Sequence, residues 1–214
     1  MSADFMIIQL PLGILEANCY LVYDADDGNG IVVDPGGDVA PLLREIEQRR
    51  VTVKAILNTH GHFDHSAGNI DLAHLHAPLA IHPADRELLA AGGGAAWFGF
   101  PPVPAVQPTL DLTAGFELAV GKLHGHVLET PGHTPGSVCL YIPEENALLT
   151  GDTLFAGSVG RTDLPGGDPR ALTESLKRLL TLPPETVIYP GHGPLSTLAQ
   201  EKRSNPWLKW IAAR

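Results

Sequence analysis

The sequence is poor in positive charge and contains no long hydrophobic run. Of its 214 residues, 14 are Lys or Arg and 24 are Asp or Glu, so the formal net charge is −10. Without clusters of basic residues the chain cannot neutralise many phosphates, which argues against nucleic acid as a partner. No apolar stretch approaches the roughly 20 residues that a membrane helix needs. We therefore expect neither nucleic-acid binding nor a membrane span.

Cysteine is also scarce. Cys19 and Cys139 lie in strand-like runs and form no Cys-x-x-Cys pair, so we expect two buried, reduced thiols. Residues 1–5 contain neither the basic segment nor the long apolar segment of a secretory signal. These features favour a cytoplasmic protein, and they leave its oligomeric state open.

Glycine and proline are abundant, with 23 and 19 copies. A chain of this length without a visible linker predicts one loop-rich domain over residues 1–214. Asp38 is the expected cap of a helix carrying Leu42, Leu43 and Ile46 at helical spacing. Further helices are predicted over residues 67–75 and 169–180, and strands over residues 5–10, 19–23, 30–34, 53–57, 79–82, 116–120, 126–130, 138–142, 147–150 and 186–189. A strand-rich block followed by helices occurs twice, which indicates an α/β layered fold.

Residues 92–108 contain four Gly and four Pro among 17 residues, so regular structure is not expected there. The segment also carries Trp97, Phe98 and Phe100. It is either a loop that anchors its aromatic side chains in the core or a lid over a substrate site.

The densest group of potential metal ligands follows the strand predicted over residues 53–57. His60, His62, Asp64 and His65 lie within six residues, on a loop that leads from this strand into a helix. Burying unpaired polar groups costs about 1 to 3 kcal/mol each, and a bound metal ion removes that cost. Imidazole and carboxylate groups at this spacing indicate a metal site.

Three further candidate ligands, His133, Asp152 and His192, each follow a predicted strand and lie next to a glycine. Strand ends can converge on one edge of a sandwich, so a shared site is geometrically reasonable. The seven nitrogen and oxygen ligands include no thiolate. They are too many for one tetrahedral catalytic ion and suit two ions that share Asp152.

With these motifs the chain resembles the metallo-β-lactamase-fold hydrolases, and within them the glyoxalase II group of thioester hydrolases. The resemblance extends from the strand before His60 through residues 190–193. It implies a four-layer αββα sandwich with the site on one edge between the two sheets. It also implies that Asp152 bridges two metal ions, one bound by His60, His62 and His133 and the other by Asp64, His65 and His192.

The resemblance further implies hydrolysis of a thioester, a hydroxyacylglutathione such as S-lactoylglutathione, by a hydroxide held between two divalent metal ions. Zinc is the expected metal, with iron and manganese as alternatives. Asp64 and Asp152 are the expected catalytic carboxylates, and Asp64 can orient the hydroxide or take up a proton. Two divalent ions, two aspartates and one hydroxide leave roughly one positive charge, which can attract an anionic substrate.

Arg161 occupies the position at which the glyoxalase II pattern places a basic residue that reads a substrate carboxylate. A guanidinium group suits that role because it can donate two parallel hydrogen bonds. The alternative is an internal salt bridge between Arg161 and Asp163 or Asp168.

Other activities remain open. Persulfide dioxygenases share the His and Asp pattern but use one iron, for which His60, His133 and Asp152 would be the ligands. The two-zinc β-lactamases usually have Cys where Asp152 stands, and a non-catalytic protein on this fold would be expected to lose ligands.

The tail at residues 201–208 resembles the short ending of single-domain glyoxalase II-like proteins, whereas two-domain enzymes add a helical domain that forms much of the glutathione site. We therefore expect thioester cleavage without a strict requirement for glutathione.

Overall fold

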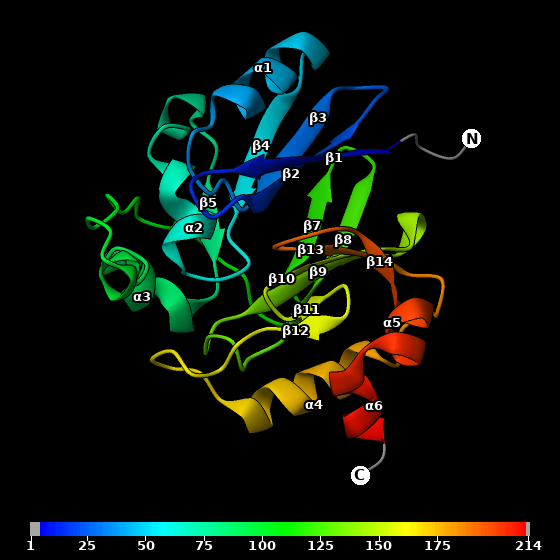
Figure 1. Cartoon of the computed structure of the whole chain (residues 1–214). Helices are drawn as coiled ribbons and strands as arrows, with labels where there is room; N and C mark the ends of the chain where they lie inside the picture. The colour runs from blue at the N-terminus through cyan, green and yellow to red at the C-terminus, as the bar shows by residue number, and fades with distance from the viewer. Residues whose placement is uncertain (1–4, 213–214) are drawn as a thin grey trace.

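The computed structural model describes residues 5–212, and within that range two six-stranded β-sheets pack face to face (Figure 1). The strands of the first sheet, in spatial and chain order, are β1 (Phe5–Leu12), β2 (Ala17–Asp24), β3 (Asn29–Val33), β4 (Thr52–Leu57), β5 (Leu79–Ile81) and β6 (Leu110–Asp111). The second sheet has the spatial order β14 (Ser196–Thr197), β13 (Val187–Pro190), β10 (Ala147–Gly151), β9 (Val138–Ile142), β8 (Leu123–Glu129) and β7 (Glu117–Val120). A short hairpin joins β11 (Leu154–Phe155) to β12 (Ser158–Val159).

Helices cover the outer face of each sheet (Figure 1). The first sheet carries α1 (Ala40–Arg49), α2 (Phe63–Ser66) and α3 (Arg86–Ala90), and the second carries α4 (Pro169–Leu179), α5 (Leu198–Ser204) and α6 (Pro206–Ala212). The arrangement is the four-layer αββα sandwich that the family resemblance implies. Among residues 5–212, none of the helices has the length and hydrophobicity required to cross a membrane. Residues 1–4, which bear on the expected lack of a secretory signal, lie outside the described range.

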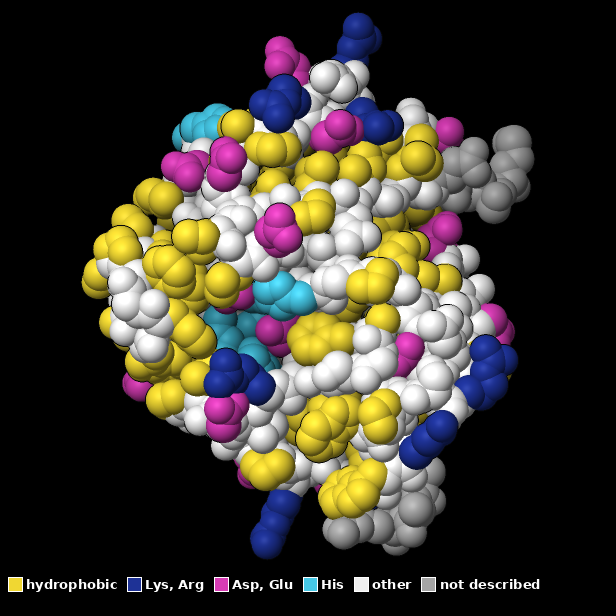
Figure 2. Space-filling model, in the orientation of Figure 1, with side chains coloured by type: hydrophobic (Ala, Val, Ile, Leu, Met, Phe, Trp, Pro, Cys, Tyr) yellow, Lys and Arg dark blue, Asp and Glu magenta, His cyan; other side chains and the backbone are white. Residues whose placement is uncertain are grey.

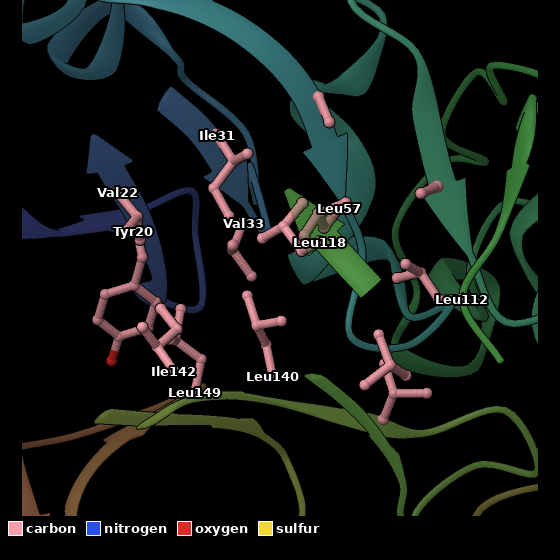
Figure 3. Packing of buried hydrophobic residues seen from close by; sticks show 14 of the residues in the cluster. Tyr20, Val22, Ile31, Val33, Leu57, Leu112, Leu118, Leu140, Ile142 and Leu149 are labelled. Atoms are coloured by element: carbon pink, nitrogen blue, oxygen red, sulfur yellow. The ribbon is translucent and has the colours of Figure 1, made fainter. Parts of the chain in front are cut away.

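The main core lies between the two sheets, where Tyr20, Val22 and Ile31 of the first sheet face Leu140 and the rest of the second sheet's inner side (Figure 3). Successive side chains of a strand point to opposite faces. Leu21, between Tyr20 and Val22, accordingly joins a second cluster under α1. All eight residues of β2 are buried because both faces of the strand are covered.

Helix α1 buries Leu42 and Ile46 against the first sheet, as its spacing predicts. The predicted cap at Asp38 is wrong. The N-cap is Val39, which makes no side-chain capping bond, and Asp38 has a φ of 39°. Pro41 lies in the first turn of α1. Main-chain N–H groups there have no acceptor within the helix, so the missing N–H of proline costs no hydrogen bond, and its fixed φ suits the helix.

The helix predicted over residues 67–75 is also wrong. The segment consists of two separate 3-10 turns, Ala67–Asn69 and Ala73–Leu75. The Gly68 N–H bonds to the carbonyl of Pro35 at 2.8 Å rather than along a helix, and a side chain at Gly68 would overlap Val39. Close packing against the loop after β3 therefore prevails over local helix propensity.

Strand direction brings the candidate ligands together. Strands β8, β10 and β13 run the same way, because β9 is antiparallel to both β8 and β10 while β10 and β13 are parallel. Their carboxyl ends, which precede His133, Asp152 and His192, therefore reach the same edge. Main-chain hydrogen bonds join the two sheets there, from Asn18 to Gly191 at 2.7 Å and from Val138 to Thr59 at 2.9 Å.

Candidate metal centre

All seven predicted ligand residues lie together at this edge. Figure 2 shows His side chains at the bottom of a hollow, with acidic side chains beside them. The loop after β4 supplies His60 and His62, α2 supplies Asp64 and His65, and the loops that follow β8, β10 and β13 supply the other three. Metal binding by these residues stays a prediction.

The first group consists of His60, His62 and His133, whose ligand atoms lie within 4.8 Å of one another. His62 Nδ1 is 2.9 Å from His133 Nε2. His133 Nδ1 donates to the main-chain oxygen of Arg161 at 2.8 Å. Since a carbonyl can only accept, this bond places the proton on Nδ1 and leaves Nε2 of His133 with a free lone pair.

The second group consists of Asp64, His65 and His192. His192 Nε2 is 3.3 Å from both His65 Nε2 and Asp64 Oδ2. His65 Nδ1 donates to Asp34 Oδ2 at 3.1 Å, so in the neutral ring Nε2 carries the lone pair. In both His133 and His65, a hydrogen bond from Nδ1 to an oxygen therefore leaves Nε2 as the nitrogen with the lone pair.

Asp152 lies between the two groups. Its Oδ1 is 3.4 Å from His65 Nε2, and its Oδ2 is 3.5 Å from His133 Nε2. Gly191 makes this position available, because a Cβ at residue 191 would overlap Asp152 Oδ1 and crowd the His65 ring. Oδ2 also lies 3.8 Å from His192 Nε2, so the carboxylate lies near both groups.

These residues fit divalent cations. Buried His60 Nε2 and Asp152 Oδ1 have no hydrogen-bond partner among the described residues, and such groups are costly unless something else satisfies them. Ligands at about 2.0 to 2.2 Å from a tetrahedral ion lie roughly 3.3 to 3.6 Å apart. The separations of 3.3 to 3.5 Å given above are of that size, and the 2.9 Å between His62 Nδ1 and His133 Nε2 is shorter.

The imidazole pKa values follow from burial and neighbouring charge. Burial, with the surrounding imidazoles, lowers the pKa of His60 well below its usual value, and burial lowers that of His62 to about 4. Burial opposes the charged form of His65 too, but nearby carboxylates outweigh it and raise the pKa of His65 well above its usual value. His60 and His62 are therefore neutral at pH 7, the form that binds metal, and a cation beside His65 competes with a proton.

Both carboxylates are held in the ionised form. Burial acts to raise the pKa of Asp64 and of Asp152, but His65 and the other imidazoles outweigh it, so both pKa values are lowered. The site therefore presents ionised oxygen ligands beside the neutral imidazoles of His60 and His62 at neutral pH.

Two buried aspartates that support the site were not predicted. Asp34 accepts from the N–H and the hydroxyl of Thr59 at 2.7 and 2.6 Å as well as from His65. It ends a buried strand just before a Pro-Gly-Gly turn, a pattern like that of the predicted ligands, and this signal could have identified it.

Asp85 is fully buried and joins two ligand loops. Its Oδ2 accepts from the Gly61 N–H at 2.8 Å and the Thr134 hydroxyl at 2.6 Å, and its Oδ1 accepts from the Gly136 N–H at 2.7 Å. Gly61 lies between His60 and His62, while Thr134 follows His133. No local sequence signal identifies this residue, because its partners are far away in the chain.

Arg161 lies beside the centre, and its guanidinium group donates two hydrogen bonds to Asp163, both at 2.7 Å. The internal salt bridge that the sequence left open is thus formed, to Asp163 rather than Asp168. Both side chains are more than half exposed, at 51% and 67%. The pair lies at the surface, where a competing carboxylate has access to it.

Residues 92–108 lie against the ligand loop. The Phe63 N–H bonds to the Gly93 carbonyl at 2.9 Å, and the Trp97 ring meets His62 edge-on with centroids 6.0 Å apart. Trp97 and Phe98 are 43% and 42% exposed, so they are not anchored in the core. The segment forms one wall of the centre, and its opening as a lid stays a prediction.

Comparison with known proteins agrees with the fold. The family model of the metallo-β-lactamase superfamily matches residues 12–192, and the chain belongs to that superfamily. A curated relative from Haemophilus influenzae, hydroxyacylglutathione hydrolase GloC, is 37% identical over 207 residues, which cover 93% of this chain and 96% of the relative.

Solved structures with different names are also similar. The B3 metallo-β-lactamase BLEG-1 has a TM-score of 0.90 and 38% identity, covering 95% of this chain and 99% of its own. A di-iron form of TTHA1623 has a TM-score of 0.84 and 42% identity over 94% of this chain and 100% of its own. ETHE1 from Myxococcus xanthus has a TM-score of 0.78 and 29% identity over 94% of this chain and 83% of its own.

Proposed function

We propose that this protein is a metal-dependent hydrolase of thioesters, with hydroxyacylglutathiones such as S-lactoylglutathione as the first substrates to test. The observation that carries the proposal is the pair of ligand groups with the Asp152 carboxylate between them. The relative named as a hydroxyacylglutathione hydrolase supports the choice of substrate.

In this proposal the residues hold two divalent ions. His60, His62 and His133 would hold one, and Asp64, His65 and His192 would hold the other, with Asp152 shared. Zinc suits this nitrogen and oxygen donor set, and the di-iron neighbour keeps iron as an alternative. When bound, such ions lower the pKa of water toward about 7 and polarise a carbonyl group.

Hydrolysis joins the oxygen of water to the carbonyl carbon and breaks the carbon–sulfur bond, giving a carboxylic acid and a thiol. The proposal assigns the proton to Asp64, and the position of its Oδ2, 3.3 Å from His192 Nε2 at the part-exposed rim of the centre, supports this choice. Its lowered pKa keeps it ionised at neutral pH, so it can accept a hydrogen bond from water and orient it. Asp34 and the Arg161 main chain keep His65 and His133 in the required tautomers.

Arg161 is the proposed contact for a substrate carboxylate. Its guanidinium group already binds the Asp163 carboxylate through two parallel hydrogen bonds, the geometry that recognition of a substrate carboxylate needs. A substrate carboxylate would replace Asp163, an exchange that the exposure of both side chains permits.

The second candidate is a persulfide dioxygenase, favoured by the similarity to ETHE1. It needs one iron held by His60, His133 and Asp152, so His192 separates the two hypotheses. His192→Ala should reduce bound metal from two ions to one and abolish thioester cleavage. Retention of one iron together with persulfide-dependent oxygen uptake would instead support the dioxygenase.

The deciding experiment measures metal content per chain together with activity on three substrates: S-lactoylglutathione, a persulfide and a β-lactam. We expect two ions per chain and cleavage of the thioester. The β-lactam is included because BLEG-1 carries the name of a β-lactamase. A single tightly held iron, unchanged on adding zinc or manganese, with no thioester cleavage would refute the proposal.

A further inference from the structure

We propose that Asn18 is a positioning residue for His192 and so decides whether the second ligand group holds its metal ion. Asn18 lies on β2 in the first sheet, whereas His192 follows β13 in the second sheet (Figure 1). The inference rests on the proposed function, because it takes the second group as the site of the second ion.

His192 is the least fixed of the candidate imidazole ligands. Its side chain is 32% exposed, whereas the other four are buried: His60, His62, His65 and His133. His65 and His133 each donate a hydrogen bond from Nδ1 to an oxygen, which holds the ring at one angle. Among the described residues, none forms a hydrogen bond with Nδ1 of His192. The position of this ring therefore depends mainly on its own main chain.

The main chain around His192 is bonded to Asn18 on both sides. The side-chain nitrogen of Asn18 donates to the carbonyl of Pro190 and to that of Gly193, both at 2.9 Å. Its main-chain N–H donates to the carbonyl of Gly191 at 2.7 Å. One residue thus binds carbonyl groups before and after the candidate ligand.

Asparagine suits this role because its amide nitrogen carries two N–H donors. Carbonyl oxygens can only accept, so the atom that faces Pro190 and Gly193 is the nitrogen and not the amide oxygen. The Asn18 side chain is 2% exposed, so water does not compete for these bonds. A Cβ at Gly193 would meet open space, so side-chain packing does not hold the loop there. The hydrogen bonds of Asn18 supply a restraint that packing does not.

Two further side chains reach the same carbonyl groups, each on one side of the ligand. The Tyr20 hydroxyl donates to Pro190 at 2.6 Å. Gln9 Nε2 donates to Gly193 at 3.2 Å, in an exposed position. Both carbonyls therefore keep a partner when the Asn18 amide is removed, and the loss need not unfold the protein. Of the three side chains, only Asn18 bonds to both sides of the ligand.

The consequence for metal binding is selective. His192 Nε2 lies 3.3 Å from His65 Nε2 and from Asp64 Oδ2, so a small movement of the residue opens the second group. The first group contains no residue of this loop, and Asp85 joins its ligand loops separately. Loss of the Asn18 amide should therefore weaken the binding of one ion and spare the other.

The first test measures the affinity for each zinc ion by stepwise competition with a chelator. Asn18→Leu removes both N–H donors at similar size. We expect the second zinc ion to bind roughly 10- to 100-fold more weakly, the range for a residue that supports a ligand, and the first to be unchanged. Asn18→Ser keeps one donor on a smaller side chain, so it should fold even where Leu does not fit and should weaken the same ion by a smaller factor. Equal weakening of both ions, or none in either variant, would overturn the inference.

Asn205→Leu is the matched control. Asn205 is fully buried, and its side-chain nitrogen also donates two hydrogen bonds, to the Ser158 carbonyl at 3.1 Å and to Glu201 Oε2 at 2.9 Å. Neither bond reaches a candidate ligand or residues 190–193. The control should lower the free energy of unfolding of chelator-treated protein and leave both zinc affinities at the wild-type values, which separates lost stability from lost positioning.

A second readout needs neither metal nor substrate. The rings of Phe155 and His192 lie with centroids 6.3 Å apart, close enough for nuclear Overhauser effects between their protons. In metal-free protein these effects should weaken in Asn18→Leu and persist in Asn205→Leu. Unchanged effects in both Asn18 variants would overturn the inference, whatever the activity. If Asn18→Leu loses these effects and the second zinc ion while the wild type cleaves no thioester, the proposed reaction fails and the positioning role stands.

Discussion

Replacing Asp85 by Asn tests whether this buried carboxylate joins the two ligand loops. The side chain is fully buried and accepts three hydrogen bonds, two from main-chain N–H groups and one from a hydroxyl. Asn offers one acceptor oxygen in place of two, so either orientation of the amide turns its N–H₂ group toward at least one of these donors. The substitution therefore leaves a buried donor without an acceptor.

The expected cost follows from those contacts. A hydrogen bond to a charged group contributes about 1.5 to 3 kcal/mol, and an unsatisfied buried donor costs about 1 to 3 kcal/mol. The easier burial of a neutral amide offsets part of this. We expect Asp85→Asn to lower the free energy of unfolding by about 2 to 4 kcal/mol, which for a chain of this size lowers Tm by roughly 4 to 16 °C.

The assay is urea unfolding of chelator-treated protein, so that loss of metal does not contribute to the result. Asp71→Asn is the matched control: it makes the same chemical change at an exposed carboxylate, and we expect no measurable change in stability. Metal affinity, measured by competition with a chelator, should also fall in Asp85→Asn and not in the control. An unfolding free energy equal to that of the wild type would refute the reasoning.

Three further predictions concern single residues. Asp152→Ala should lose both metal ions and all turnover. A residue that only supports a ligand would lower metal affinity or activity by roughly 10- to 100-fold. Two ions retained on metal analysis would show that another group bridges. Arg161 holds the pKa of Asp163 at about 2, so the pair is intact above the usual carboxyl pKa of 3.8 and is lost as the pH falls toward 2. In Arg161→Ala an NMR titration should find that pKa back near its usual value, and kcat/KM should fall by about 1.5 to 3 kcal/mol for carboxylate-bearing thioesters only. Burial raises the pKa of Cys139 to about 11, and that of Cys19 is also raised, so neither thiol should react with iodoacetamide at pH 8 until the protein unfolds, as mass spectrometry would show.

Much of the fold was predictable because its signals are local. The strand-forming run at residues 19–23 and the helical spacing of Leu42 and Ile46 are properties of short segments, and the structure confirms the strand and the helix. The dense grouping of His60 to His65, and the glycine after each of several strands, likewise indicated a site at strand ends. The free, buried state of both cysteines followed from their apolar surroundings.

Tertiary structure decided what depends on distant partners. Residues 67–75 lose their helix because Gly68 packs against Pro35, and Asp85 becomes a link between loops only when residues 61 and 136 meet across the sheets. Composition and spacing determine which chemical groups a chain carries, whereas hydrogen-bond partners and hollows arise from contacts between segments that no local pattern specifies.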